Sequence, residues 1–195
     1  MKIGLQTWGT DGDFFPFLAL AIGLKNAGHE VTITYTSIDG TDYSNRADAE
    51  GIPLIRANAE DEISEGANPY AINAKAGSFK EYTQLLELYF DPHSEAMYAA
   101  SEQLCKENDL VIGHAVCHTL LTAAQKHSCP RVSLILTPLI VRSKYMSPIG
   151  IELGTFFNSF LWNVGGKVAT SRCSTFYQTI DSSCTTFWKT HHHSI

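Results

Sequence analysis

The opening of the chain carries two strand-like patterns with a helix-like pattern between them. Residues 2–8 form a short apolar run that stops at the turn-forming residues 9–13. Residues 30–36 alternate Val, Ile and Tyr with threonine, and this period of two with β-branched side chains is typical of a strand. The stretch spans about 35 residues, which is the length of a βαβ unit with parallel strands.

The segment between these strands predicts a buried helix, because residues 16–26 are apolar nearly all round. Pro16 suits the first helical position, since its ring pre-sets φ and its missing N–H would have no partner there. Phe15 would then be the N-cap, and Asp13 would lie outside the helix with a free side chain. Gly28 lies where a residue in the left-handed region commonly ends a helix.

The alternation of helices and strands continues along the chain. Residues 60–68 are acidic and predict an exposed loop, and Asp91 with Pro92 should divide a long helical pattern in two, with Asp91 as the N-cap. The other predicted strands are residues 52–56, 109–114 and 131–137, and the other predicted helices are residues 43–50, 78–107, 117–127 and 156–168. Strands separated by helices predict an α/β fold, a Rossmann-like three-layer domain with a mostly parallel sheet.

A change in composition marks the predicted end of this domain. Residues 169–195 are rich in Ser and Thr, show no apolar period and end near a run of three histidines. We therefore expect one domain over residues 1–168 and an irregular tail over residues 169–195.

Composition excludes several classes of protein. The chain has 14 Lys and Arg against 20 Asp and Glu, a formal net charge of −6, and no basic cluster, which disfavours nucleic acid and anionic membranes as partners. The longest apolar stretch, residues 14–24, is shorter than the roughly 20 residues that a bilayer needs. The start of the chain lacks the pattern of a secretory signal, and five cysteines without a C-x-x-C pair do not form a recognisable disulfide framework. We expect a reduced, cytoplasmic protein without a transmembrane segment.

The loop after the first strand is the most informative place for chemistry, because ligands of parallel sheets bind beyond the carboxyl ends of the strands. Its sequence, Gly-Thr-Asp-Gly-Asp over residues 9–13, is neither the dinucleotide fingerprint nor a P-loop. Two aspartates would repel a phosphate. A carboxylate there can cap the following helix, or it can act as a general base in a cleft. Both interpretations stay open for Asp11 and Asp13.

Residues 9–21, GTDGDFFPFLALA, and residues 23–31, GLKNAGHEV, resemble the opening of the sterol and antibiotic UDP-glucosyltransferase-like family. That family begins with a strand, then G-[ST]-x-G-D-x-x-P-x-[LIV]-A-L, then a helix that ends A-G-H-E-V. The resemblance continues more loosely through residues 109–114 and 129–132. It implies one half of a GT-B fold, the acceptor-binding N-terminal domain of an inverting, metal-independent hexosyltransferase that takes its sugar from a UDP- or TDP-linked donor.

The resemblance also implies roles for individual residues. Asp13 matches the expected general base, which takes the proton from a hydroxyl of a lipid, sterol or natural-product acceptor. Gly9, Thr10 and Gly12 match residues close to the sugar and diphosphate. No cofactor or metal is implied, because the nucleotide sugar is a co-substrate. The acceptor, the sugar and its nucleotide are not identified by the sequence.

Two departures from the family pattern stand out. The family commonly has Arg where this chain has Asp11, which replaces a cation by an anion. Nothing in the chain resembles the donor domain, with its H-x-G-x-G-T or proline-rich UDP-binding signature. We therefore expect the isolated chain to have little or no transferase activity.

His114 is the second candidate catalytic residue, at the end of a predicted central strand. Plant-type relatives place there an aspartate that orients a histidine base, so in this chain His114 would steady Asp13 or contact the acceptor; a histidine that only bonds the loop backbone is the alternative. His118 follows four residues later, but no third ligand supports a zinc site. Tyr145, in the apolar loop of residues 138–150, would line an acceptor pocket or pack against a partner domain.

Two other functions compete with this interpretation. One is another two-domain enzyme, such as a nucleotide-sugar epimerase, although its phosphate-binding loops would not contain Asp11 and Asp13. The other is a binding or regulatory module in which the aspartates only cap a helix. An exposed apolar face would indicate a missing partner domain or a homodimer.

Overall fold

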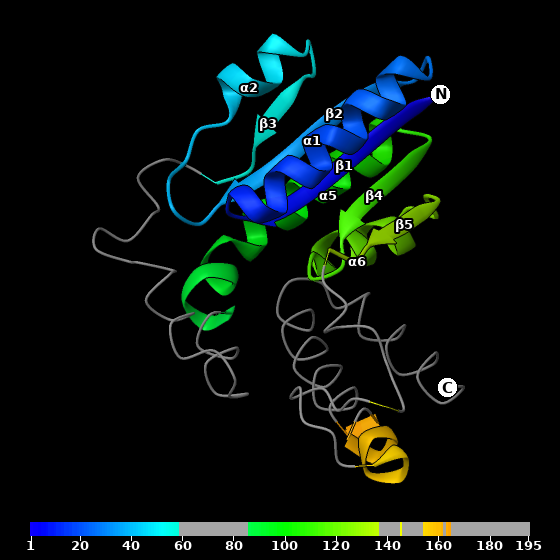
Figure 1. Cartoon of the computed structure of the whole chain (residues 1–195). Coiled ribbons are helices and arrows are strands. Elements are labelled where there is room, and N and C mark those ends of the chain that lie inside the picture. Colours follow the sequence, from blue (N-terminus) through cyan, green and yellow to red (C-terminus); the bar gives the residue numbers. More distant parts are fainter. Residues whose placement is uncertain (59–85, 137–144, 146–153, 162, 165–195) are drawn as a thin grey trace. The chain divides into compact units, whose positions relative to one another are not determined.

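The computed structural model describes residues 1–58, 86–136, 145, 154–161 and 163–164 (Figure 1). The chain divides into two units, residues 1–136 and 137–195. The predicted tail, the predicted domain boundary at residue 168 and the predicted acidic loop of residues 60–68 lie outside the described residues.

The first unit is built on a five-stranded parallel sheet. Its strands are β1 (Lys2–Gly9), β2 (Glu30–Ser37), β3 (Leu54–Arg56), β4 (Leu110–His114) and β5 (Arg131–Leu134), in the order β3-β2-β1-β4-β5. Every neighbouring pair is parallel. The chain moves outward from β1 to β3 and then returns to place β4 on the other side of β1. The predicted α/β class is confirmed, and β1 and β4 form the topological switch point of the sheet.

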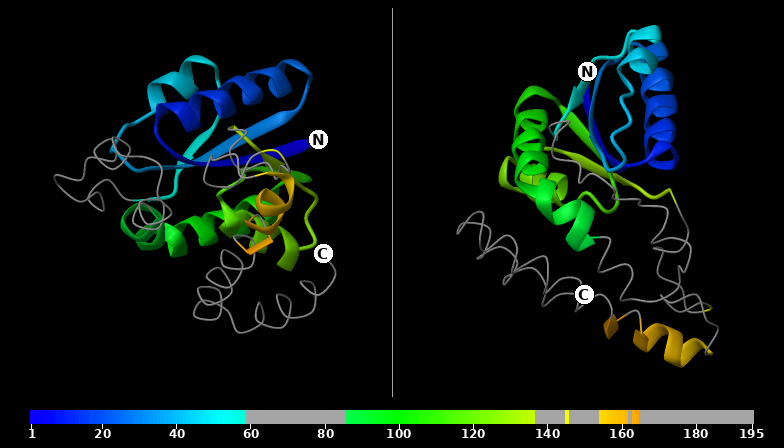
Figure 2. Two further views of the ribbon diagram at one scale, coloured as in Figure 1. Left: turned by 60° about the horizontal axis from the view of Figure 1, so that its bottom comes forward. Right: turned by 90° about the vertical axis from the view of Figure 1, so that its left-hand side faces the viewer.

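Helices cover both faces of this sheet. They are α1 (Asp11–Asn26), α2 (Ser44–Ala49), α5 (Ser94–Glu107) and α6 (His118–Lys126), with a π-helical turn at Leu86–Phe90 and a 3₁₀ turn at Asp91–His93. Figure 2 shows α1 and α5 on opposite sides of the strands, which gives the predicted three layers. The expected break near Pro92 is present, but His93 is the N-cap of α5 and the expectation that Asp91 caps it is wrong. The proline fits the 3₁₀ turn, which delays the α-helix to Ser94.

The start of α1 also differs from the sequence-based expectation. The helix begins at Asp11 with Thr10 as the N-cap, and Pro16 lies inside it. The backbone N–H groups of Asp13 and Phe14 donate to the carbonyl of Thr10 at 2.9 and 3.0 Å, which closes the first turn. Pro16 is the sixth residue of α1 and has no N–H to donate to the Gly12 carbonyl, so the helix lacks one backbone hydrogen bond there. Asp13 is therefore a first-turn residue of the helix.

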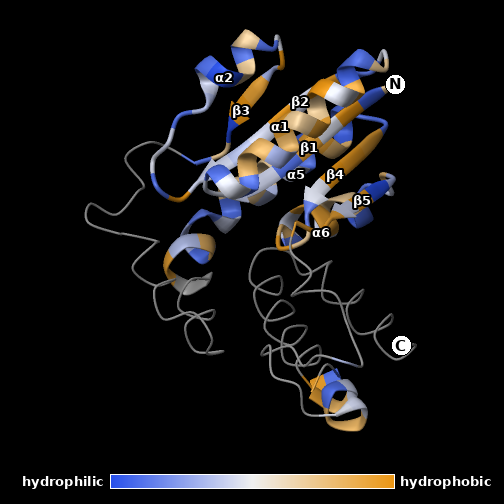
Figure 3. Cartoon of the chain, in the orientation of Figure 1, coloured by the Kyte–Doolittle hydropathy of each residue, from blue (hydrophilic) through white to orange (hydrophobic). Residues whose placement is uncertain are grey.

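Two clusters of buried apolar side chains pack against the sheet among the residues that the structure describes. The larger joins α1 to β1 and β2 and includes Phe14, Phe17 and Leu5, all at most 2% exposed. The smaller gathers Trp8, Phe90 and Cys117 with their neighbours near the carboxyl ends of the strands. Figure 3 shows β4, inside the sheet, as a largely apolar strand and β5, at its edge, as a more polar one. This difference fits the exposure of β5, of which Arg131, Val132 and Ser133 are exposed.

In the second unit, residues 155–161 are helical and residues 163–164 are helical as well, which agrees with the predicted helix where it is described. Three phenylalanines of this segment, Phe156, Phe157 and Phe160, are 77%, 60% and 54% exposed. The homodimer through an exposed apolar face remains a prediction. Among the described residues, no helix is both long enough and apolar enough to cross a membrane.

Candidate functional site

The candidate site lies at the switch point, where β1 and β4 end side by side. Asp13 comes from the first turn of α1, directly after β1, and His114 is the last residue of β4. The two strands are paired in parallel from Ile3 with Leu110 to Gln6 with Gly113, so their carboxyl ends open at the same edge. Residues 101 positions apart in the sequence are thereby brought together at the edge where ligands of open parallel sheets bind.

Gly9 allows the carboxylate of Asp13 to lie over the end of β1. Its φ is +135°, a conformation that side chains rarely adopt, and a Cβ there would overlap Asp13 Oδ2 and lie 2.6 Å from Asp13 Cγ. The backbone N–H of Thr10 donates to Oδ2 at 3.1 Å, which is the carboxylate half of a capping box. The cap alternative raised by the sequence is thus confirmed for Asp13.

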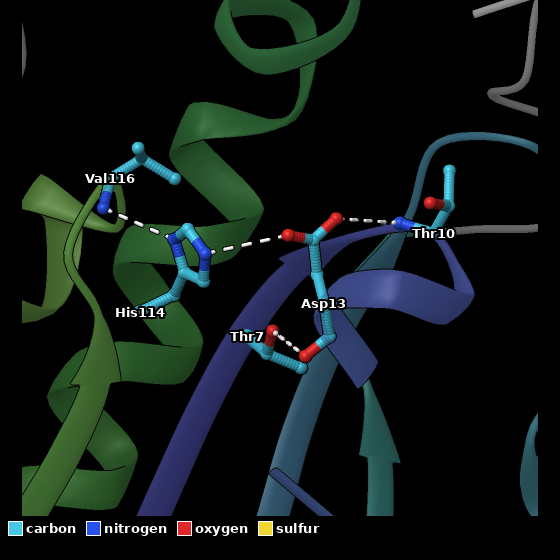
Figure 4. Close-up of polar contacts among 5 residues, drawn as sticks. All are labelled: Thr7, Thr10, Asp13, His114 and Val116. Carbon is cyan, nitrogen blue, oxygen red and sulfur yellow. Dashed lines mark hydrogen bonds and ion pairs between the residues drawn. The ribbon is translucent and has the colours of Figure 1, made fainter. Parts of the chain in front are cut away.

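The other oxygen of Asp13 faces His114 (Figure 4). Asp13 Oδ1 and His114 Nε2 are 3.4 Å apart, within ion-pair distance and longer than an ordinary hydrogen bond. The side chain of His114 is 8% exposed, whereas that of Asp13 is 35% exposed. The carboxylate is therefore the member of the pair that solvent or a ligand can reach.

A backbone contact fixes which nitrogen of His114 carries the proton. The N–H of Val116 donates to His114 Nδ1 at 3.2 Å, so Nδ1 is an acceptor. In the neutral ring the proton then resides on Nε2, the nitrogen that faces Asp13. Asp13 therefore accepts a hydrogen bond from Thr10 N–H and faces His114 Nε2 at 3.4 Å, while Val116 N–H occupies the other nitrogen of the ring. Of these two side chains, only Asp13 can receive a proton from a third group.

Asp11 has a separate role, although it lies only two residues from Asp13. Its Oδ1 accepts a hydrogen bond from the hydroxyl of Tyr43 at 2.9 Å. The Tyr43 ring stacks on Phe14 at 3.9 Å and is 2% exposed. Burial raises the pKa of Tyr43 well above its ordinary range, and the hydrogen bond to Asp11 raises the pKa further. Asp11 thus fastens the loop after β2 to the start of α1.

The other polar side chains between the end of β4 and the start of α6, those of Cys117 and His118, have structural roles. Cys117 is fully buried, and burial, followed by the nearby charge of Asp13, raises its pKa strongly, so its thiol is not a nucleophile at neutral pH. His118 stacks on Phe90 at 4.4 Å, and burial lowers its pKa. In the described part of the chain no group of three or more His, Cys, Asp or Glu side chains could hold a metal ion.

The other residues that the sequence singled out divide into two groups. Gly9, Thr10 and Gly12 share the corner with Asp13, and a Cβ at Gly12 would meet nothing within 4 Å. Tyr145 belongs to the second unit and is 67% exposed. Sequence reasoning missed Tyr43 and Val116. Tyr43 sits in a run of polar residues that gives no sign of its partner, and Val116 acts through its backbone, which no pattern of side chains reveals.

Comparison with known proteins finds no match among protein-family models and none among curated proteins. Solved structures with a similar chain course include the glycosyltransferase SnogD from Streptomyces nogalater, with 20% identity and a TM-score of 0.48 over 73% of this chain and 34% of that one. The calicheamicin glycosyltransferase CalG4 gives 18% identity and a TM-score of 0.49 over 68% of this chain and 32% of that one. The C-terminal domain of a hydrogenase from Pyrococcus furiosus gives 12% identity and a TM-score of 0.47 over 68% of this chain and 89% of that one.

The chain spans about a third of the length of SnogD and of CalG4. Likeness at these identities and TM-scores extends to a hydrogenase domain as well, so it decides neither an activity nor a substrate. An activity for this chain has to rest on the geometry of its site.

Proposed function

We propose that this chain is the acceptor-binding half of an inverting glycosyltransferase, in which Asp13 is the general base. The observation that carries the proposal is the carboxylate of Asp13. It lies at the switch point, its side chain is 35% exposed, Oδ2 accepts a hydrogen bond from Thr10 N–H, and Oδ1 lies 3.4 Å from His114 Nε2. The family-like sequence of residues 9–21 supports the same role.

The proposed reaction needs one proton acceptor at the acceptor hydroxyl. Asp13 accepts the hydroxyl proton as that oxygen attacks the anomeric carbon of a nucleotide sugar. The bond from the anomeric carbon to the diphosphate oxygen breaks, and the nucleoside diphosphate leaves with the electron pair. Attack opposite the leaving group inverts the anomeric centre. His114, whose Nε2 lies 3.4 Å from the carboxylate, acts as a positioning residue, because its other nitrogen accepts the hydrogen bond from Val116 N–H.

The donor would be bound largely by a part of the protein that this chain does not contain. Gly9, Thr10 and Gly12 are proposed to approach the sugar and diphosphate, and the open space beside Gly12 suits that role. The proposed acceptors are hydroxylated lipids, sterols or natural products, with Tyr145 as a proposed contact. No metal takes part in this scheme, since Asp13 removes the proton and the diphosphate leaves with charge stabilised by the donor half.

A non-catalytic binding module is the second candidate function. The hydrogen bond from Thr10 N–H to Asp13 favours it, because a capping box is a structural feature that many helices share. The two functions differ in what happens at Asp13 Oδ1. A general base needs that oxygen for an acceptor hydroxyl, whereas a cap needs only Oδ2.

Calorimetric titration of the whole chain with a panel of apolar hydroxylated acceptors tests the proposal, with Asp13→Asn as the variant. Asp11→Asn is the matched control, because it removes the same charge two residues away at a carboxylate committed to Tyr43. We expect Asp13→Asn to weaken acceptor binding about tenfold and Asp11→Asn to change it little. UDP-glucose and TDP-glucose should bind weakly to either protein.

Equal losses in both variants would mean that charge alone matters and would favour the binding module. Tight binding of a nucleotide sugar to this chain alone would contradict the division into acceptor and donor halves.

A further inference from the structure

We propose that His118 is a positioning residue for the candidate site and orients His114 toward Asp13 through the backbone of Val116. His118 is the first residue of α6, and His114 is the last residue of β4. The structural role of His118 thus extends to the site. The importance of Asp13 rests on the proposed function, whereas the hydrogen bonds between the two histidines stand independently of it.

The backbone of Val116 joins the two histidine rings. Its N–H donates to His114 Nδ1 at 3.2 Å. Its carbonyl oxygen accepts from the backbone N–H of His118 at 2.9 Å and lies 3.1 Å from Nδ1 of the His118 ring. A carbonyl oxygen can only accept, so His118 Nδ1 carries a proton and donates to it. Hydrogen bonds on both sides of its Cα therefore fix the orientation of Val116.

The backbone between the two histidines is a tight turn that the His118 ring strengthens. Cys117 has a φ of −77° and a ψ of 69°, the conformation of an inverse γ-turn. In this turn the Val116 carbonyl accepts from the N–H two residues later, and the His118 ring supplies a second donor to the same oxygen. The ring thereby restrains the turn that directs the Val116 N–H at His114.

Packing holds the His118 ring in this position. The ring stacks on Phe90 with centroids 4.4 Å apart and an interplanar angle of 22°. Phe90 is fully buried, and its ring meets that of Trp8, next to Gly9 in β1, edge-on at 5.4 Å. Burial lowers the pKa of His118, so the ring is neutral at pH 7 and its one proton is the one on Nδ1.

The consequence for the site is the choice of tautomer at His114. Figure 4 shows the His114 ring between Val116 and Asp13. With Nδ1 accepting from Val116, the proton of the neutral ring lies on Nε2, which is 3.4 Å from Asp13 Oδ1. If Val116 turned away, Nδ1 could take the proton, and a lone pair on Nε2 would then face the carboxylate and repel it. His118 therefore favours the tautomer that Asp13 attracts.

The test is long-range ¹H–¹⁵N NMR of the histidine rings in the whole chain at pH 7.5. We expect the proton of His118 on Nδ1 and that of His114 on Nε2. His118→Phe keeps a ring against Phe90 but removes the donor, so His114 should show both tautomers. His118→Asn gives up the stack and keeps a side-chain N–H near the position of Nδ1, so the Nε2 tautomer of His114 should be restored.

A second measurement links these hydrogen bonds to Asp13. Titration with the panel of apolar hydroxylated acceptors should show about fivefold weaker binding in His118→Phe and recovery in His118→Asn, the effect of one lost hydrogen bond. If no protein binds an acceptor while the tautomers change as expected, the proposed function fails and the positioning of His114 by His118 is supported.

Two results would overturn the inference: a His118 ring protonated only on Nε2 in the unaltered chain, or a His114 tautomer that is the same in His118→Phe as in the unaltered chain. The dispersion of the amide spectrum shows whether each variant is folded. Where a variant fails to fold, the tautomers of the two rings in the unaltered chain decide the outcome.

Discussion

The two corners that build the candidate site differ in where their geometry comes from. In the β1–α1 corner, residues 9–13, contacts within the corner place Asp13: Gly9 leaves room for its carboxylate, Thr10 is the N-cap of α1, and Asp13 accepts a hydrogen bond from Thr10 N–H. The β4–α6 corner, residues 114–118, has no side-chain cap on its helix. Its histidine is fixed by the backbone of Val116 and by packing.

The comparison shows how a local motif becomes a chemical site. A capping box alone would give Asp13 an ordinary structural role. The second corner adds a buried imidazole 3.4 Å from the other carboxylate oxygen, because β4 pairs with β1 at the switch point. The first corner can therefore be recognised in the sequence, whereas the second acquires its role through the sheet.

The largest effect is expected from Gly9→Ala, which breaks the first corner. The substitution forces a Cβ into the Asp13 carboxylate at a φ of +135°, and we expect a loss of about 2–4 kcal/mol in the free energy of unfolding. Urea denaturation measures it. Gly12→Ala is the control, since a Cβ there meets nothing within 4 Å and alanine is the better helix former. Equal losses in both variants would show that the close approach at Gly9 is unimportant.

The second corner is tested by His114→Ala. It leaves the Val116 N–H without an acceptor and removes a buried ring that lies 6.2 Å from Phe17, so we expect a loss of about 2 kcal/mol in the free energy of unfolding. His114→Asn keeps an acceptor at the position of Nδ1, so we expect it to lose only about half as much free energy of unfolding as His114→Ala. Urea denaturation compares the two variants. No recovery in His114→Asn would contradict the assignment of Nδ1 as the acceptor.

Tyr43→Phe isolates the tie between Asp11 and the loop after β2. The stack on Phe14 is kept and one hydrogen bond is lost, so we expect a loss of about 1 kcal/mol at pH 7. Because the pKa of Tyr43 is raised in the folded protein, the unaltered chain should lose stability as the pH rises above about 10. That loss should be smaller in the variant. Urea midpoints at pH 8 and pH 10.5 compare the two proteins, and equal shifts would contradict the role of Tyr43.

The smallest effect concerns His118 in the second corner. Burial lowers its pKa in the folded protein, so the unfolded chain binds its proton more readily and stability should fall as the pH drops below about 6.5. His118→Phe keeps a ring against Phe90 and should reduce this fall by less than about 1 kcal/mol. Urea midpoints at pH 7.5 and pH 5.5 measure the difference. A fall of the same size in the variant would assign the effect to other histidines.

Much of the fold was predictable from the sequence. The strands before Gly9 and after Gly28, the helix between them and the parallel α/β class follow from periodicity and turn residues. The start of α1 was not predicted correctly. Pro16 is typical of the first position of a helix, whereas Thr10 and Asp13 stabilise a start five residues earlier, at Asp11. The N-cap of α5 was misplaced for a similar reason, since a 3₁₀ turn separates Pro92 from the helix.

The candidate residues of the site were also visible, because Asp13 follows one predicted strand and His114 is the last residue of another. The pairing of Asp13 with His114 could not be predicted. It requires β4 to lie next to β1 in the sheet, and no local sequence pattern indicates which strands are neighbours. The same holds for Tyr43, whose hydrogen-bond partner Asp11 is 32 residues away in the sequence.

The sequence by itself determined most of the helices and strands, the polar loop after β1 and the residue types available there, because these depend on local propensity and hydrophobic period. Only the tertiary structure decided that Asp13 is reachable while His114 is not, that Val116 sets the tautomer of the ring, and that Asp11 is committed to Tyr43. The physical reason is that burial and hydrogen-bond partners are set by strand pairing and packing between residues distant in the sequence.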